Sequence, residues 1–352
     1  MNICYTGGGT GGHIFPIFPI DEELKKKNPS VKRFYIGRIS ELEQSWVEKE
    51  GIEYYGIQSG KLRRYHSFQN VTDIFRIIFG FFQALTLLRK NRPSIVFSKG
   101  GYVSVPVVIA AYILRIQCIC HESDATPGLA NRISIIFATT MCVAHEDVKK
   151  YFPLKQRPKC LVTGVPTRMN KGKYIQQKAY PHPLIAIFGG SLGAQNINEL
   201  VAPIMNELTT ISYVVHQTGV GKGISASYPR YERYEFIEDE YINILGQADI
   251  VISRSGATTL ADYVEMEVPS ILIPLGRDAS RGDQILNAKR LEHTGRAIVL
   301  YSETLTSEQL LETIQKVLED THRLEKMREQ LRGRRSQRVE TLIASIILDT
   351  VD

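Results

Sequence analysis

The sequence predicts an α/β protein built from two Rossmann-like domains, each with a doubly wound parallel sheet. Short apolar runs typical of strands alternate with helical patterns along the whole chain, which is the order that βαβ units require. A strand, a glycine-rich loop and a helix open the chain, and the same order restarts at Leu184 after a polar, proline-containing stretch. A chain of 352 residues is also long enough for two cores. We therefore expect domains at residues 1–166 and 167–335 that face each other across a cleft.

The expected elements follow from these runs, taken in chain order. Strands are expected at residues 2–5, 34–36, 94–97, 117–120, 140–144 and 159–163, and then at 184–188, 213–216, 250–253, 270–274 and 297–300. Helices are expected at residues 14–24, 70–90, 102–115, 128–137, 194–208, 306–318, 322–332 and 336–348. Pro19 should delay or kink the first helix, because proline does not fit a regular helix interior.

Composition limits the classes of function. No run of 18 apolar residues is present, and residues 2–5 are too short for the apolar part of a signal peptide, so neither a membrane-spanning segment nor a signal peptide is expected. The five cysteines form no CxxC pair, and we expect buried free thiols. Residues 1–168 carry 23 Lys and Arg against 13 Asp and Glu, a net charge of +10, whereas the rest of the chain has a net charge of −4. The basic half suggests an anionic ligand or surface, and no motif for nucleic acid accompanies it.

Two glycine-rich loops follow strands and suggest phosphate sites. The first loop contains GxGxxG as Gly7, Gly9 and Gly12, and its backbone N–H groups could meet a phosphate at the start of a helix. A dinucleotide site would add an acid after the second strand, where this chain has Gly37-Arg38. Because Arg38 could instead bind the ribose phosphate of NADP, an NADP-dependent oxidoreductase is the alternative. A non-catalytic nucleotide-binding module is a third hypothesis.

The second half carries the better nucleotide site. The loop Gly189-Gly-Ser191 opens a helix, so a diphosphate would meet N–H groups and the positive end of the helix. The segment 254–262 is a second turn of this kind, and Asp262, one turn into its helix, could reach ribose hydroxyls. An ordinary turn and an exposed helix acid are the alternatives.

Titratable residues follow other strand ends in the first half. His13 stands directly after the first loop and could act as a general base, or could simply cap or pack the helix. Lys99 lies in a second glycine turn, residues 98–104. The segment His121-Glu-Ser-Asp124 places carboxylates at a strand end, although Ser123 or Asp124 could instead cap the helix that follows.

The segment 68–92 is apolar nearly all round and has basic residues at its flanks. Helices of this kind are usually buried, which is one interpretation. The other is a patch that dips aromatic side chains into a membrane surface while its cations meet anionic headgroups, and the charge excess of the first half favours it. The predicted patch comprises Ile74, Phe75, Ile78, Phe79, Phe82, Arg63, Arg64, Arg76 and Arg89.

Five motifs follow one another along the chain: Thr6-Gly-Gly-Gly-Thr-Gly-Gly-His13, Ser98-Lys-Gly-Gly-Tyr-Val-Ser-Val-Pro106, residues 121–132, Gly189-Gly-Ser-Leu-Gly-Ala-Gln195 and Asp283-Gln-Ile-Leu-Asn-Ala288. Together they resemble the MurG family of N-acetylglucosaminyltransferases, within glycosyltransferase family 28. The resemblance implies a GT-B fold and inverting transfer from UDP-GlcNAc to lipid I, without a metal ion or cofactor. It also implies an N-terminal acceptor domain to which the final helix, residues 336–352, returns, and a C-terminal donor domain. A related glycolipid glycosyltransferase is the nearest rival.

The resemblance also implies where the substrates bind. Donor contacts fall on Thr10, Gly11, Gly12, Asp124, Arg168, Ser191, Ile237, Ala257, Thr258, Thr259, Leu260, Ala261, Asp262 and Gln284. The acceptor diphosphate falls on Gly9, Gly11, Lys99, Gly100, Gly101 and Tyr102. His13 is the first candidate for the base and Asp124 the second. The implied location is peripheral, on the anionic cytoplasmic face of the cell membrane, together with other cell-wall synthesis proteins.

Overall fold

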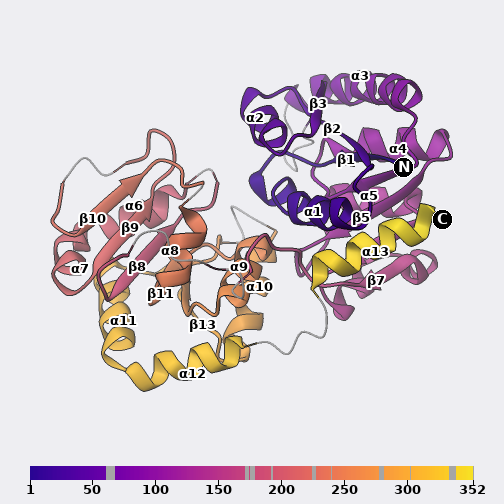
Figure 1. Ribbon diagram of the computed structural model, residues 1–352. Coiled ribbons are helices and arrows are strands. Elements are labelled where there is room, and N and C mark those ends of the chain that lie inside the picture. The colour runs from indigo at the N-terminus through magenta and orange to yellow at the C-terminus, as the bar shows by residue number, and fades with distance from the viewer. Residues whose placement is uncertain are drawn as a thin grey trace. The chain divides into compact units, whose positions relative to one another are not determined.

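The computed structural model describes residues 1–60, 68–170, 174, 179–191, 193–223, 227–238, 240–276, 281–301, 303–332 and 338–351. The chain divides into two compact units (Figure 1). Unit 1 comprises Met1–Arg168 and Ser336–Asp352, and unit 2 comprises Met169–Arg335. Unit 2 is therefore inserted, along the chain, into unit 1.

A parallel sheet of seven strands forms the centre of unit 1. Its order is β3-β2-β1-β4-β5-β6-β7, so the direction of winding reverses between β1 and β4. The strands are β1 (Asn2–Thr6), β2 (Lys32–Arg38), β3 (Glu53–Ile57), β4 (Ile95–Ser98), β5 (Gln117–Glu122), β6 (Thr140–Val143) and β7 (Cys160–Val162). Nearly continuous burial along β1 and β4 fits a sheet that is covered on both faces.

Helices complete the two faces of this sheet. One face packs against α3 (Phe68–Asn91), α4 (Ser104–Ile113) and α5 (Leu129–Phe137). The remaining helices are α1 (Ile17–Lys27), α2 (Glu41–Lys49) and α13 (Val339–Val351), with short 3₁₀ helices at Gly11–His13, Glu146–Tyr151 and Leu154–Lys159. In Figure 1, α13 lies against α1, and it also contacts β4 and β5.

The first helix starts later than the apolar pattern alone suggests. α1 begins at Ile17 instead of Ile14, after a 3₁₀ turn, which is the delay expected from Pro19. Pro19 occupies the first turn of α1, where backbone N–H groups have no partner within the helix. The proline is therefore accommodated without a break in the helix.

Unit 2 contains a parallel sheet of six strands in the order β10-β9-β8-β11-β12-β13. Its strands are β8 (Leu184–Phe188), β9 (Tyr213–Gln217), β10 (Tyr231–Tyr234), β11 (Ile250–Ser253), β12 (Ser270–Leu272) and β13 (Ala297–Val299). One face packs against α6 (Gln195–Val201), α7 (Met205–Ile211), α11 (Ser307–Glu319) and α12 (Thr321–Leu331). The other face packs against α8 (Tyr241–Gln247), α9 (Ala257–Met266) and α10 (Asp283–His293). Here the winding reverses between β8 and β11.

Two expectations need correction. The single helix predicted at 194–208 is wrong, because a 3₁₀ turn at Ala202–Ile204, which contains Pro203, separates α6 from α7. The predictions also omitted α2, β3, β10, α8 and α10. The expected free, buried cysteines are confirmed for all five. In the described part of the chain, no helix has both the length and the apolar character needed to span a bilayer.

Candidate functional site

In both units the predicted glycine loops lie at the point where the winding of the sheet reverses. The loop after β1 and the turn after β4 share this position in unit 1. The loop after β8 and the turn after β11 share it in unit 2. Ligands of open parallel sheets bind at the carboxyl ends of the strands at this point. Each unit therefore offers one candidate binding edge.

The two loops of unit 1 pack backbone against backbone. A Cβ atom at Gly101, whose φ is +87°, would collide with the carbonyl oxygen of Gly8, so this contact requires glycine. The ring of Tyr102 covers Gly9, where a Cβ atom would lie 2.8 Å from it. Part of the glycine content of the first loop thus serves packing.

A buried carboxylate from α2 holds the first loop. Oε1 of Glu43 accepts hydrogen bonds from the N–H of Gly9 at 3.0 Å and from Nε of Arg38 at 2.6 Å. The expected contact of the Gly9 N–H with a diphosphate therefore competes with a bond inside the protein. Arg38, which the oxidoreductase alternative needs for a ribose phosphate, is paired with the same carboxylate.

His13 ends the 3₁₀ turn that follows the first loop. Its Nδ1 lies 3.1 Å from Oγ1 of Thr10, which fixes the ring relative to the loop. The Arg168 guanidinium, at the end of the first segment of unit 1, lies 5.2 Å from the centroid of the Phe15 ring. Thr10, His13 and Arg168 thus belong to the same unit.

The loop that presents Asp124 is closed by its neighbour Glu122. One oxygen of Glu122 accepts from the N–H of Asp124 at 2.9 Å. The other accepts from the N–H of Gly128 at 2.9 Å and from Nδ2 of Asn131 at 3.0 Å. The expected capping of α5 by Ser123 or Asp124 is not found, because Gly128 is the N-cap residue. Glu122 is a structural carboxylate, and Asp124 is the partly exposed one.

Lys99 is buried, with only 2% of its surface exposed. Its Nζ donates to Oγ of Ser123 at 2.6 Å, and Ser123 lies 3.4 Å from Nδ1 of His121. Burial lowers the pKa of Lys99 to about 8, against the opposing effect of Glu122 and Asp124. Burial, and secondarily the charge of Lys99, holds the pKa of His121 well below its ordinary value. The ammonium of Lys99 therefore faces the loop of residues 121–124, which follows β5 at the same edge of the sheet.

In unit 2 the loop after β8 is open on one side. Gly190 has φ of +80°, and nothing lies within 4 Å of the position that its Cβ atom would take. The side-chain amide of Gln217, at the end of β9, donates to the carbonyl of Gly190 at 2.9 Å. It also accepts from the N–H of Ile237 at 2.9 Å. Ser191 follows Gly190 and is partly exposed.

The turn after β11 leads directly into α9, whose N-cap residue is Gly256. Ala257, Thr258, Thr259 and Asp262 are partly exposed at the start of this helix, whereas Leu260 and Ala261 are buried. A direct donor contact is therefore open to the former group and not to the side chain of Leu260. Asp262 accepts from the hydroxyl of Tyr241 at 3.4 Å.

Gln284, on α10, supports the same turn. Its backbone carbonyl accepts from Oγ of Ser255 at 2.8 Å, and its side-chain Oε1 accepts from the N–H of Leu275 at 3.1 Å. α10 is thereby joined to the segment that precedes α9.

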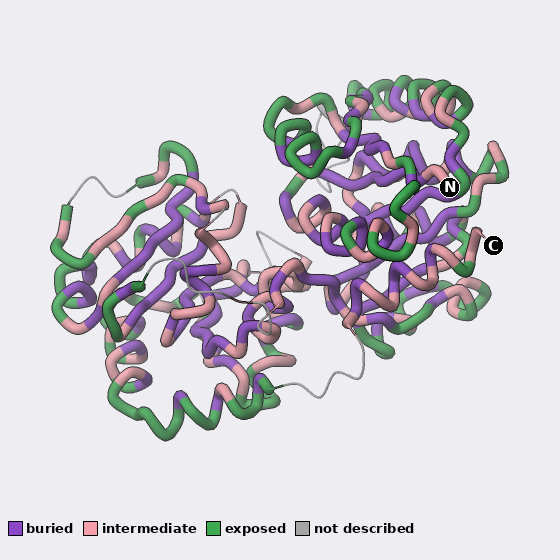
Figure 2. Tube along the Cα trace, viewed as in Figure 1, coloured by how far each residue is buried: buried purple, intermediate pink, exposed green. Residues whose placement is uncertain are grey.

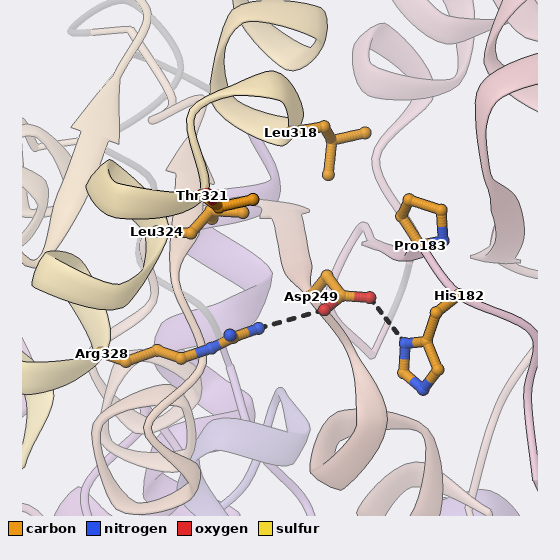
Figure 3. Close-up of a pocket in the computed structure, with 7 residues that line it drawn as sticks. All are labelled: His182, Pro183, Asp249, Leu318, Thr321, Leu324 and Arg328. Carbon is orange, nitrogen blue, oxygen red and sulfur yellow. Dashed lines mark hydrogen bonds and ion pairs between the residues drawn. The ribbon is translucent and has the colours of Figure 1, made fainter.

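A pocket of about 310 Å³ lies at the opposite ends of the unit 2 strands (Figure 3). Asp249, just before β11, accepts from the N–H of Leu184 at 2.9 Å and from Nη2 of Arg328 at 3.1 Å, and it lies 2.7 Å from Nδ1 of His182. The Asp249 carboxylate thus joins three segments. This arrangement is a structural brace away from the glycine loops.

α3 presents an apolar stripe on the surface of unit 1, and Figure 2 shows exposed and buried residues alternating along it. Phe79, Phe75 and Phe82 are 65%, 59% and 57% exposed, and Ile74 and Ile78 are exposed beside them. Ala84 and Leu88, on the other side, are fully buried. The interpretation of α3 as a helix buried all round is therefore wrong. Arg76 and Arg89 are exposed, and Arg63 and Arg64 lie outside the described residues.

Three polar residues that hold the loops have roles that the sequence pattern does not predict: Glu43, Asn131 and Gln217. Glu43 bonds to Gly9, which is 34 residues away in the sequence, and Asn131 bonds to Glu122, which is 9 residues away. Gln217 bonds to Gly190, which is 27 residues away. A local signal existed only for the helix that carries Glu43, because Ser40 caps it and accepts from the Glu43 N–H. Among the described residues, no cluster of three His, Cys, Asp or Glu side chains could hold a metal ion.

Each unit has a parallel sheet in which the direction of winding reverses, with glycine loops at the carboxyl ends of the strands at that point. Two such domains define the class of GT-B proteins. Solved structures of similar fold include Acinetobacter baumannii MurG, with a TM-score of 0.72 and 23% identity over 99% of both chains. A UDP-GlcNAc 2-epimerase from Neisseria meningitidis, bound to UDP-GlcNAc, has a TM-score of 0.68 and 15% identity, and the match covers 100% of this chain and 99% of that one. The predicted fold class is confirmed.

The family follows from sequence. The N-terminal domain of glycosyltransferase family 28 matches residues 3–143, and the C-terminal domain of that family matches residues 184–343. A Lachnospira eligens protein is 42% identical over 329 residues, which are 91% of this chain and 92% of its own. A Bacillus cereus protein is 38% identical over 353 residues, 98% of both chains. Both are named UDP-N-acetylglucosamine–N-acetylmuramyl-(pentapeptide) pyrophosphoryl-undecaprenol N-acetylglucosamine transferase, the second with the number 2.

The chain belongs to glycosyltransferase family 28. This result confirms the resemblance and the assignment as a glycosyltransferase, and it sets aside the oxidoreductase and the non-catalytic module.

Proposed function

We propose that this enzyme transfers N-acetylglucosamine from UDP-GlcNAc to the muramyl sugar of undecaprenyl-pyrophosphoryl-MurNAc-pentapeptide, which converts lipid I to lipid II in peptidoglycan synthesis. The observation that carries the proposal is the identity of 42% and 38%, over 91% and 98% of this chain, with relatives named for that transfer. The transfer inverts the configuration of the sugar, as the family motifs imply.

The donor binds unit 2 at the carboxyl ends of β8 and β11, which are neighbours in the sheet. There the loop of Gly190 and Ser191 and the first turn of α9 both offer backbone N–H groups. Negative charge grows on the UDP diphosphate as the glycosidic bond breaks, and these N–H groups stabilise it. Asp262, held by Tyr241, accepts from the ribose hydroxyls.

The acceptor binds unit 1, where a base must take the proton of the sugar hydroxyl. His13 is the first candidate, because Thr10 orients its ring at the end of the first loop. Asp124 is the second, because Glu122 and Asn131 hold its loop and leave it partly exposed. The acceptor diphosphate meets the N–H groups of the first loop and of the turn at residues 100–102.

The apolar stripe of α3 supports a contact between unit 1 and the membrane surface. Phe75, Phe79 and Phe82 are exposed on one stripe, and Arg76 and Arg89 are exposed on the same helix. Aromatic side chains at the depth of the headgroups, with cations beside anionic lipids, bind a bilayer peripherally. This contact brings the enzyme to a lipid-linked acceptor at the cytoplasmic face, where other cell-wall synthesis proteins are partners.

Turnover with a lipid-linked muramyl acceptor tests the proposal. The purified chain, mixed with radiolabelled UDP-GlcNAc and a short-chain lipid I analogue, should give a labelled lipid disaccharide and release UDP. The control reaction replaces the acceptor with a glycolipid that lacks the muramyl sugar. Equal transfer to the control would point to a glycolipid glycosyltransferase, and no transfer to either acceptor would contradict the proposal.

A further inference from the structure

Gln217 occupies the last position of β9, and 5% of its surface is exposed. Its Nε2 donates to the carbonyl of Gly190 at 2.9 Å, and its Oε1 accepts from the N–H of Ile237 at 2.9 Å. A carbonyl can only accept and an N–H can only donate, so the partners themselves fix the orientation of the amide. Both polar ends of this buried side chain are therefore used.

These two bonds join segments that are far apart in the sequence. Gly190 lies in the loop after β8, which is open on one side, and its carbonyl also accepts from the N–H of Gly193 at 3.0 Å. Ile237 lies three residues beyond the end of β10 and is buried. The side-chain amide of Gln217 thus connects the loop after the central strand β8 to the loop after the outer strand β10.

The residues next to Gln217 are themselves fixed. Nε2 of His216 lies 3.0 Å from Oδ1 of Asn198, whose Nδ2 donates to the carbonyls of Thr218 and Lys222 at 3.0 Å. Burial lowers the pKa of His216 to about 4, aided by Arg233, so this histidine is neutral near pH 7. The residues at the end of β9 therefore support the loop of Gly190 through hydrogen bonds between uncharged groups. His216, being neutral, does not provide a positive charge for a diphosphate.

We propose that Gln217 is a positioning residue that sets nucleotide specificity, because it couples the loop of Gly190, which receives the diphosphate, to Ile237, one of the donor contacts that the family resemblance implies and the position where we place the uracil base. The inference rests on the proposed donor site in unit 2. A uridine diphosphate sugar can bind productively only if its base and its diphosphate are held in the correct positions at the same time. Without the amide, the Gly190 carbonyl and the Ile237 N–H each lose a buried partner, and the two segments shift independently.

The first experiment compares Gln217→Met, which keeps the length of the side chain and removes both hydrogen bonds, with the wild-type chain. Dissociation constants for UDP and ADP are measured by calorimetry, and the melting temperature is recorded for each protein. We expect UDP binding to weaken about 10- to 100-fold, as for the loss of one or two buried hydrogen bonds, and ADP binding to weaken less than threefold. The preference for UDP over ADP should fall accordingly.

A second variant, Gln217→Glu, carries the test even if the methionine variant unfolds. A protonated glutamic acid can accept from Ile237 and donate to Gly190, whereas the carboxylate can only accept. Relative to wild type at each pH, UDP binding by this variant should improve as the pH falls from 8 to 5.5. A purely structural role gives no such recovery.

Three outcomes would overturn the coupling. The first is a dissociation constant of Gln217→Met for UDP within threefold of the wild-type value, and the second is an equal weakening of UDP binding and ADP binding in that variant. The third is UDP binding by Gln217→Glu that does not improve, relative to wild type, as the pH falls. A wild-type chain that fails to bind UDP contradicts the proposed donor site instead, so the two failures are distinguishable.

Discussion

Glu43, Glu122 and Gln217 are buried, whereas the groups they hold in place lie nearer the surface. Glu43 binds the first loop, Glu122 closes the loop that presents Asp124, and Gln217 holds the loop of Gly190. Buried side chains that bond to a loop keep a site in one geometry, because moving them leaves polar atoms without partners. At the scale of residues, the site depends as much on these supports as on the groups that face the substrates.

Lys99→Met should stabilise unit 1 at neutral pH. The pKa of Lys99 is about 8 in the folded chain and about 10.4 in an unfolded one, so folding disfavours the charged form. Between pH 8 and 10.4, Lys99 binds a proton more often in the unfolded state than in the folded state. The free energy of unfolding of the wild-type chain therefore increases as the pH rises through that window. The contribution should reach about 2 kcal/mol by pH 9.5 and be absent from the variant.

The measurement uses urea unfolding followed by the fluorescence of Trp46, the only tryptophan, which lies on α2 of unit 1. Lys32→Met, at an exposed position of unit 1, is the control. A difference between wild type and Lys99→Met that stays constant from pH 7 to 9.5 would show that Lys99 keeps its charge in the fold.

His13→Ala should lower turnover about 100-fold or more, the usual contribution of a general base, and change UDP-GlcNAc binding little. Thr10→Val removes the hydroxyl that orients the ring and should lower turnover less. Steady-state kinetics with the lipid I analogue, together with calorimetry for UDP-GlcNAc, separate the two effects. If the alanine variant keeps wild-type turnover, Asp124 becomes the leading candidate.

At the scale of elements, α3 combines two roles along one helix. Ala84 and Leu88 pack into the core, while the phenylalanines four and three residues apart at 75, 79 and 82 are exposed. A sequence that is apolar all round does not reveal this division, because both faces have the same composition. The tertiary neighbours of α3 decide which face is covered.

Replacing Phe75, Phe79 and Phe82 together by Ser should reduce binding to vesicles that contain phosphatidylglycerol and leave unit 1 folded, because all three side chains are exposed. Vesicle sedimentation measures binding, and Trp46 fluorescence measures unfolding. Leu88→Ala is the control: it should keep vesicle binding and cost about 2–5 kcal/mol of stability, since Leu88 is fully buried. Unchanged sedimentation of the triple variant would contradict a membrane role.

The elements that the sequence predicted correctly are those with continuous apolar runs, such as β1, β4, β5 and β8. Two of the missed elements lack such runs: β10, with the sequence YERY, is a polar edge strand, and α10, with the sequence DQILNAKRLEH, mixes a few apolar residues with polar and charged ones. The loops could be located because glycine, strand and helix signals coincide there. The bonds from Glu43 and Gln217 could not, because they join residues that only the fold brings together.

At the scale of the whole molecule, unit 1 is formed by two separate parts of the chain. Glu340, at the start of α13 and 1% exposed, accepts from the N–H of Thr167 at 2.6 Å and from Nε of Arg338 at 3.1 Å. Thr167 lies where the chain leaves unit 1, and Glu340 lies where it has returned. One carboxylate therefore joins the exit and the return of the chain.

Glu340→Ala should lower the stability of unit 1 by about 1–3 kcal/mol, because the buried N–H of Thr167 loses its partner. The urea midpoint of Trp46 fluorescence measures the change. Thr341→Val, which removes a hydrogen bond from the hydroxyl to Glu23, is the matched control with a smaller expected effect. Equal midpoints for Glu340→Ala and wild type would mean that the Glu340 carboxylate does not contribute to holding α13 on unit 1.

The return of α13 also sets an order of events during synthesis. Residues 1–168 leave the ribosome first, but the side chains of Ile343 and Ile347, which are fully buried in the finished protein, are made only after all of unit 2. Until then the surface of α1 that faces α13 has no cover, in a nascent chain that already contains all seven strands of its sheet. Unit 2 is one uninterrupted stretch and can fold during that interval. A ribosome that stalls in unit 2 would thus leave an unfinished first domain with apolar surface open to chaperones and proteases.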